Sequence, residues 1–376
     1  MLTLSKSISL ILAGALFSSF ASAQTTSVKL TTATLNPAVI TTATTVATPT
    51  VTKVTTPVTT TRDTTGVTTI KIENLDLLDK IGRYEHPLIV YKSVKPTAAD
   101  IEKQLSLSKR FAELSGMRFD DSPKKLGDTR LALRSAEDAS ASFEVDINTG
   151  NFLFESGLAK YSADEPTLNL PKEADLQRLA ERTLKQFDLP INPSDLKIEH
   201  IGGLNLSVAD GKNEPKIFEK LKTIRYTRVL NGLPVMGDSR IVMHFGESAQ
   251  LSGLIYQIPE VADASDLSTK LQQSPKLMKE QALGELTAMA KKSLRAKLTQ
   301  VDLVVYDDGL GVMEPAYHVV MERLLDLGDK EPVMIPYDFY LPVSSQPVAF
   351  FPHMDTGMFM PEEGRSTEGG VVGKAD

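Results

Sequence analysis

The chain has 376 residues, a formal net charge of -7 and no cysteine. The acidic balance argues against a nucleic-acid-binding face, because such faces neutralise phosphates with clustered Lys and Arg. Without cysteine the chain forms no disulfide and has no thiol nucleophile, so stability outside the cytoplasm has to come from packing.

Residues 1–23 are typical of a signal peptide. A single positive charge at Lys6 precedes an apolar run from Ile8 to Phe20, and Ala21-Ser22-Ala23 supplies the small residues that a signal peptidase needs. The apolar run is too short for a comfortable membrane span, so no stable membrane insertion is expected. The pattern predicts an exported protein, which is secreted, or periplasmic if the source is Gram-negative.

Two segments have the composition of disordered chain. Residues 24–66 contain 19 threonines among 43 residues and no aromatic residue, so they bury too little apolar area to offset the entropy of ordering. They predict a Thr-rich linker, which is either a spacer or glycosylated stalk or simply a tolerated leader. Residues 353–376 are rich in Gly and Glu without periodicity and predict a disordered tail.

Between these segments the chain has the composition of a folded protein. Its length is near the upper limit for one hydrophobic core, and a helical pattern followed by strands occurs three times. We therefore expect an α+β fold of two or three modules, each a helix packed on an antiparallel sheet. The predicted ranges are 67–170, 171–263 and 264–352.

The first range opens with a helix capped by Thr97, with Asp100 three residues on. Strands follow at 130–134 and, as a hairpin, at 141–147 and 151–155. The turn of that hairpin, Asp146-x-Asn148-x-Gly150, has the spacing of the start of a calcium loop, but Gly157 stands where the bidentate glutamate belongs. A hairpin turn is the favoured interpretation.

The second range begins with a helix that has Pro171 in its first turn, followed by a strand at 196–208. A three-stranded antiparallel meander is then predicted at 221–230, 239–245 and 250–258. Asn231-Gly232 is a strong hairpin signal, and a second turn is expected at 246–248.

The third range begins with a helix at Ser274-Pro275, an N-cap followed by proline, and continues with strands at 301–306, 316–323 and 333–341.

Motifs for enzymatic chemistry are missing from the sequence. The five histidines form no chelating pair, and we expect His244 and His318 to be half-buried strand residues. We interpret the acidic pairs Asp120-Asp121 and Asp307-Asp308 as solvated loop residues. The sequence leaves open whether the fold brings other acidic residues together into a site. The sequence therefore predicts a non-enzymatic protein with no catalytic, cofactor-binding or metal-binding residue.

The meander contains a strand aromatic, a Gly-x-Pro-Val-x-Gly turn and a Val-containing strand that ends in a Gly turn: Tyr226, Gly232, Pro234, Val235, Gly237, Val242 and Gly246. Through these residues it resembles the propeptide region of thermolysin-family and fungalysin-family zymogens. Arg228 stands where that pattern commonly has Gln. The same residues are also good turn formers in an unrelated β-meander.

Two further segments resemble the PepSY module that accompanies metalloprotease propeptides. Val145, Asp146, Thr149 and Gly150 match its closing hairpin, and Ala316, Tyr317 and Val319 match its central strand. The hairpin lies before the meander rather than near the end, which departs from the family's order. The resemblance implies α+β modules of the PepSY or cystatin-like kind.

The resemblance implies an exported propeptide-like protein that inhibits a thermolysin-type metalloprotease in trans or acts as a chaperone for its folding. The implied partner is a secreted metalloprotease, yet the His-Glu-x-x-His of a catalytic domain is absent from this sequence. The alternative is a secreted or surface-associated non-enzymatic binding or structural module on a Thr-rich stalk.

Overall fold

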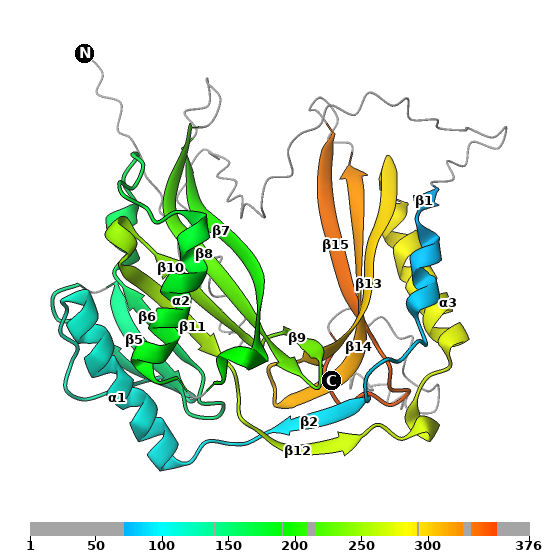
Figure 1. The fold of residues 1–376 in the computed structure, drawn as a ribbon, viewed down its shortest axis with the longest axis horizontal. Coiled ribbons are helices and arrows are strands. Elements are labelled where there is room, and N and C mark those ends of the chain that lie inside the picture. Colours follow the sequence, from blue (N-terminus) through cyan, green and yellow to red (C-terminus); the bar gives the residue numbers. More distant parts are fainter. Residues whose placement is uncertain are drawn as a thin grey trace, which may run out of the picture. The chain divides into compact units, whose positions relative to one another are not determined.

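The computed structural model describes residues 71–138, 140–189, 191–208, 216–291, 293–325 and 332–351. The predicted signal peptide (1–23), Thr-rich linker (24–66) and tail (353–376) lie outside these residues. The described chain divides into two compact units: unit 1 is Val90–Ser265 with Gly311–Met313, and unit 2 is 71–89, 266–310 and 314–351. Both combine helices with sheet strands, so the protein is α+β, as predicted (Figure 1).

Unit 1 is built on an antiparallel sheet with strand order β7-β8-β10-β11-β6-β5-β4-β3. Its strands are β3 (Lys124–Leu126), β4 (Arg130–Arg134), β5 (Ala141–Asp146), β6 (Phe152–Ser156), β7 (Leu196–Val208), β8 (Lys216–Leu230), β10 (Arg240–Phe245) and β11 (Leu251–Gln257). Alternation along β10 puts Ile241, Met243 and Phe245 in the core.

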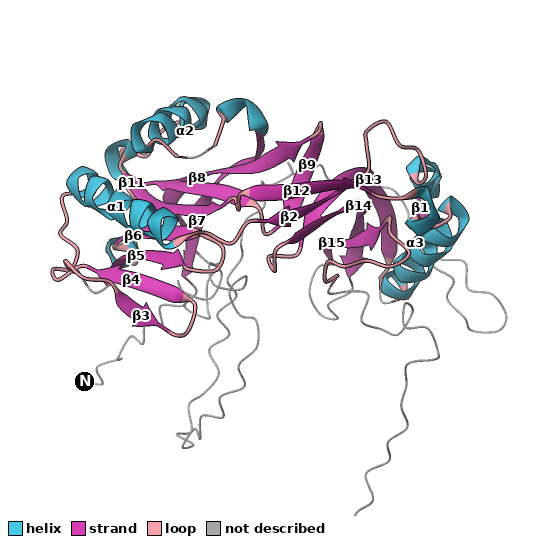
Figure 2. Cartoon of the chain, turned by 90° about the horizontal axis from the view of Figure 1, so that it is seen from below, coloured by secondary structure: helices cyan, strands magenta, loops and turns pink. Residues whose placement is uncertain are grey.

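Helices α1 (Ala98–Ser115) and α2 (Glu173–Phe187) cover one face of this sheet (Figure 2). The predicted cap of α1 is confirmed, because Thr97 and Asp100 form a reciprocal capping box. The predicted start of α2 was too early: the N-cap is Lys172, so Pro171 precedes the helix instead of lying in its first turn.

The two helices share one hydrophobic core. Phe111 of α1 stacks on Phe187 of α2 and on Phe154 of β6, with ring centroids 3.8 Å and 4.5 Å apart. Strand β6 pairs with β11, with Phe154 opposite Leu254. The ranges 67–170 and 171–263 thus contribute strands to a single sheet.

The predicted meander is confirmed in β8, β10 and β11, which pair antiparallel in that order. Asn231 and Gly232 have φ of 48° and 82°, the conformation of a type I′ hairpin turn. Strand β9 (Leu233–Gly237), which the sequence did not predict, follows this turn and pairs with the end of β8.

Unit 2 has strand order β15-β14-β13-β1, with β1 (Ile72–Glu73) parallel to β13 (Arg295–Asp307). Strands β14 (Val312–Leu325) and β15 (Val333–Pro342) pair antiparallel. Helix α3 (Pro275–Ala290) begins as predicted, with Ser274 as N-cap. It buries Met278, Ala282 and Leu286 fully.

Strands β2 (Ile89–Ser93) and β12 (Val261–Asp266) are neighbours that the sequence did not predict, and β3 and β1 were missed as well. These strands are short or lack clear alternation, so periodicity gives little signal for them. Within the described residues, no helix has the length and apolar character needed to cross a lipid bilayer.

Candidate functional site

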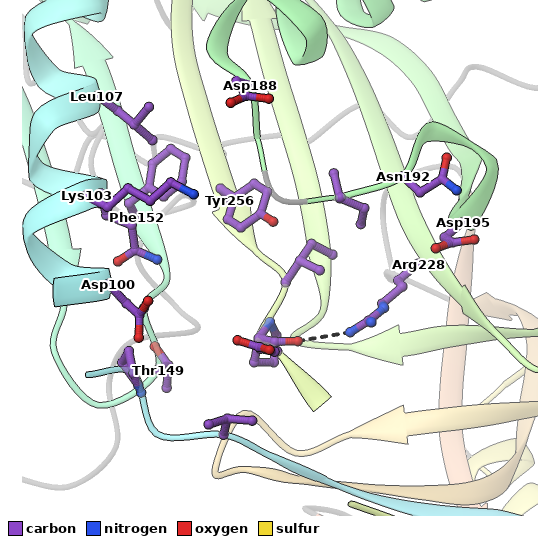
Figure 3. A pocket seen from close by; sticks show the side chains of 18 residues that line it. Asp100, Lys103, Leu107, Thr149, Phe152, Asp188, Asn192, Asp195, Arg228 and Tyr256 are labelled. Carbon is purple, nitrogen blue, oxygen red and sulfur yellow. Dashed lines mark hydrogen bonds between the residues drawn. The ribbon is translucent and has the colours of Figure 1, made fainter. Parts of the chain in front are cut away.

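A cavity of about 370 Å³ lies entirely within unit 1. Its walls come from the first half of α1, the turn between β5 and β6, the segment that follows α2, and the ends of β8 and β11 (Figure 3). A volume of this order is within the range of small-molecule and peptide sites.

The cavity has an apolar base. Leu107 of α1 and Ile258 after β11 line it, and the rings of Phe152 and Tyr256 stack there with centroids 4.8 Å apart. Phe152 is 2% and Tyr256 is 1% exposed, so the base is fixed by the core beneath it. An apolar group that entered the cavity would gain by leaving water.

Two buried polar atoms of lining residues have no hydrogen-bond partner among the described residues: the Tyr256 hydroxyl and Gln104 Oε1. Figure 3 shows the phenol of Tyr256 in the middle of the lining side chains, between Lys103 and Arg228. Burial raises the pKa of Tyr256, so its hydroxyl stays protonated at neutral pH and is available as a donor.

Charged side chains surround this base. The acidic ones are Asp100, Asp188, Asp195 and Glu260, and the basic ones are Lys103 and Arg228, so four carboxylates face two cations. Arg228 Nη1 donates to the carbonyl oxygen of Pro259 at 2.9 Å, the dashed line of Figure 3. The cavity is therefore formally negative and favours cationic groups.

The lining residues include no His, Ser or Cys, and all of them belong to the described part of the chain. A protonated phenol and an amide can bind and orient a ligand.

The histidines lie apart from this cavity. His244 on β10 is buried, and burial lowers its pKa to about 4, with Nδ1 2.9 Å from Thr223 Oγ1. His318 on β14 is also buried, with Nε2 3.0 Å from Asp338 Oδ2 and its ring stacked on Tyr340. The described residues contain no group of three or more His, Asp or Glu side chains that could hold a metal ion.

The Asp146 segment forms a hairpin turn, as predicted. Its carboxylate Oδ1 accepts hydrogen bonds from the backbone N–H of Asn148 and of Thr149, and Gly150 has φ 73°. This oxygen is committed to the turn.

The expectation of solvated acidic pairs was wrong for Asp307. It is 3% exposed at the end of β13, and its carboxylate accepts from the N–H of Gly309. Glu314, 1% exposed, likewise accepts from the N–H of Val348 and of Ala349. Both carboxylates accept backbone hydrogen bonds within unit 2. The residues next to them in the sequence do not indicate this role.

Sequence reasoning did not identify the cavity. It named Asp100 as part of a cap and Thr149 and Gly150 as parts of a turn. The alternation of β11 could have placed Tyr256 on the core side, but nothing local shows that its hydroxyl lacks a partner.

No protein-family model and no curated protein matches this chain. The chain is similar to the crystal structure of an uncharacterized protein from Eubacterium rectale, with 11% identity, a TM-score of 0.43, and coverage of 69% of this chain and 84% of that one. It is also similar to the Bacillus megaterium YpeB C-terminal domain, with 12% identity, a TM-score of 0.31, and coverage of 67% and 94%. Both are partial backbone likenesses, and the propeptide resemblance stays a prediction.

Proposed function

We propose that this protein is an exported, non-enzymatic binding protein of the propeptide type. It acts in trans on a thermolysin-type metalloprotease, either by inhibiting it or by assisting its folding. The observation that supports this proposal is the meander itself, because the residues that carry the propeptide resemblance occupy backbone positions with specific requirements.

Three glycines of the motif illustrate this. Gly232 and Gly237 have φ of 82° and 95°, which favour glycine. Gly246 lies so close to Tyr161 that a Cβ would stand 1.8 Å from the phenol oxygen. The pattern therefore describes a preorganised element of unit 1, which a partner can bind without first ordering it.

A second candidate is a secreted or surface-associated binding module without a protease partner. The cavity of unit 1 supports it as well, because a site that recognises a short segment serves a partner of either kind. Both candidates make the protein a binder, and they differ in the partner.

The test mixes the purified full chain with a panel of thermolysin-type proteases from the same source. Peptide hydrolysis and refolding yield are followed at near-stoichiometric ratios, with a serine protease as the control enzyme. We expect slower hydrolysis or a higher refolding yield for at least one metalloprotease and no effect on the control. If a folded protein changes neither quantity for any metalloprotease, the second candidate replaces the first.

A further inference from the structure

The cavity of unit 1 has the size and lining of a peptide-side-chain site. Its base is formed by Leu107, Phe152 and Ile258, and its volume is about 370 Å³. One large apolar side chain with its adjoining main chain fits such a space. The stacked Phe152 and Tyr256 rings are almost completely buried and give the base a rigid support.

The two unpartnered atoms are complementary in type to the two polar groups of a peptide unit. The Tyr256 hydroxyl can donate to a carbonyl oxygen, and Gln104 Oε1 can accept from an N–H. A buried polar group without a partner carries a free-energy penalty, which a ligand that supplies the partner removes. A main-chain amide offers both groups at once.

The charged residues around the base of the cavity form its rim. Their net charge favours a particular kind of residue next to the apolar side chain of a bound peptide. Asp188, Asp195 and Glu260 come from two segments that border the cavity, and with Asp100 they outnumber Lys103 and Arg228. Arg228 keeps its charge while it donates to the Pro259 carbonyl, and four carboxylates against two cations give the lining a formal excess of negative charge. A basic residue beside the apolar one complements this charge.

We propose that the unit 1 cavity binds a linear peptide segment in which a large apolar side chain is followed by a basic one. This deepens the proposed function and rests on it for the source of the segment, which is the protease partner.

The binding test uses the absence of tryptophan from this chain. Acetyl-Ser-Trp-Arg-Ser-amide is titrated with the full chain, and the emission of its indole, the only tryptophan in the sample, is recorded. We expect a saturable blue shift as the indole leaves water. The matched peptide with Glu in place of Arg should bind about tenfold more weakly, because it adds a negative charge to a negative rim. Tryptamine, which has the indole and a cation but no amide, should also bind more weakly.

A pair of variants isolates the hydroxyl. Tyr256→Phe removes the unpartnered group from the cavity, and Tyr226→Phe removes another buried unpartnered hydroxyl from the same core, outside the cavity lining. Neither hydroxyl has a hydrogen-bond partner among the residues that the structure describes, so both variants should melt at or slightly above the wild-type temperature. Only Tyr256→Phe should weaken the Trp-Arg peptide, by about fivefold.

A second pair isolates the charge. Glu260→Gln should shrink the preference for Arg over Glu, while Glu102→Gln, an exposed α1 residue outside the lining, should leave it unchanged. Equal binding of the Arg and Glu peptides, equal binding of tryptamine, or unchanged affinity of folded Tyr256→Phe would each overturn the inference.

The outcomes separate this inference from the proposed function. If the peptide binds as expected but no metalloprotease is affected, the cavity inference is supported and the protease partner is rejected. If a metalloprotease is inhibited but the peptide does not bind, the proposed function is supported and the cavity inference is rejected.

Discussion

The phenyl ring of Phe111 on α1 stacks on that of Phe187 on α2, with centroids 3.8 Å apart and an interplanar angle of 16°. The two side chains are 0% and 1% exposed, although their helices are far apart in the sequence. Because each ring fills space that the other would leave empty, the helices depend on one another for their packing.

Replacing Phe111 by alanine should lower the free energy of unfolding of unit 1 by about 3–5 kcal/mol, because it opens a cavity beneath both helices. Urea unfolding followed by circular dichroism measures the loss. Leu114→Ala is the matched control on the same helix, since Leu114 is 46% exposed, and it should change stability little.

The same pair tests whether the ranges 67–170 and 171–263 fold as one body. In the double variant with Phe187→Ala, the losses should fail to add by about 1 kcal/mol, as is typical of residues in contact. Additive losses with two separate transitions would indicate independent modules.

Replacing Gly232 by valine should destabilise the β8–β9 turn by about 1–3 kcal/mol, because a β-branched residue resists the φ of 82° found there. The same substitution at Gly284, where a Cβ meets no atom within 4 Å, should not destabilise α3. Thermal melts compare the two. If the proposed function holds, metalloprotease inhibition should fall for the first variant and persist for the second.

Local features of the fold were predictable because their signals are local. The capping box at Thr97, the N-cap at Ser274 and the Asn231-Gly232 turn each depend on a few adjacent residues. The predicted strand at 196–208 has the bounds of β7, which begins directly after the turn at Pro193–Asp195.

Strand pairings between residues that are far apart in the sequence leave no comparable signal in the sequence. Nothing near Phe154 in the sequence indicates that Leu254 lies opposite it, so the common sheet of unit 1 was not predicted. The cavity follows from the same pairings, since it joins α1, the β5–β6 turn and the end of β11. Asp307 looked like a loop residue because its burial comes from the fold rather than from its neighbours.

The stability of the protein should fall as the pH decreases from about 6.5 to about 4, in part through His244. Burial lowers the folded-state pKa of this histidine from 6.5 to about 4, so the unfolded chain binds the proton more readily in this interval. The stability contribution is complete above pH 6.5 and is lost as the pH falls, and the difference corresponds to about 3 kcal/mol.

The measurement compares urea unfolding of the wild type and of His244→Gln at several pH values between 7 and 4. Carboxylates titrate in both proteins, so the difference between the two curves reports the histidine. The variant should have the shallower dependence of the free energy of unfolding on pH. Parallel curves for wild type and His244→Gln would mean that the pKa of His244 is the same in the folded and the unfolded protein.

Lys220 should prove essential for the conformation of the segment that precedes α2. Its side chain is 2% exposed, and its ammonium group donates to the carbonyl oxygens of Ala163 and Glu165. Burial lowers the pKa of Lys220, while the negative charges of Glu165 and Asp164 oppose that change. The two carbonyl oxygens stabilise the buried ammonium charge, and the ammonium group in turn supplies the hydrogen bonds that these oxygens need.

Lys220→Met keeps the length of the side chain and removes every donor, leaving both carbonyls unpaired. We expect a loss of about 2–3 kcal/mol in the free energy of unfolding, because unpaired buried acceptors carry their full desolvation penalty. The segment can regain hydrogen bonds only by opening to water, so limited proteolysis should cut residues 162–168 faster in the variant. Lys216→Met, at the exposed start of β8, makes the same chemical change without these partners and should match the wild type in both assays. A Lys220→Met protein that melts and resists proteolysis like the wild type would show that other contacts fix the segment.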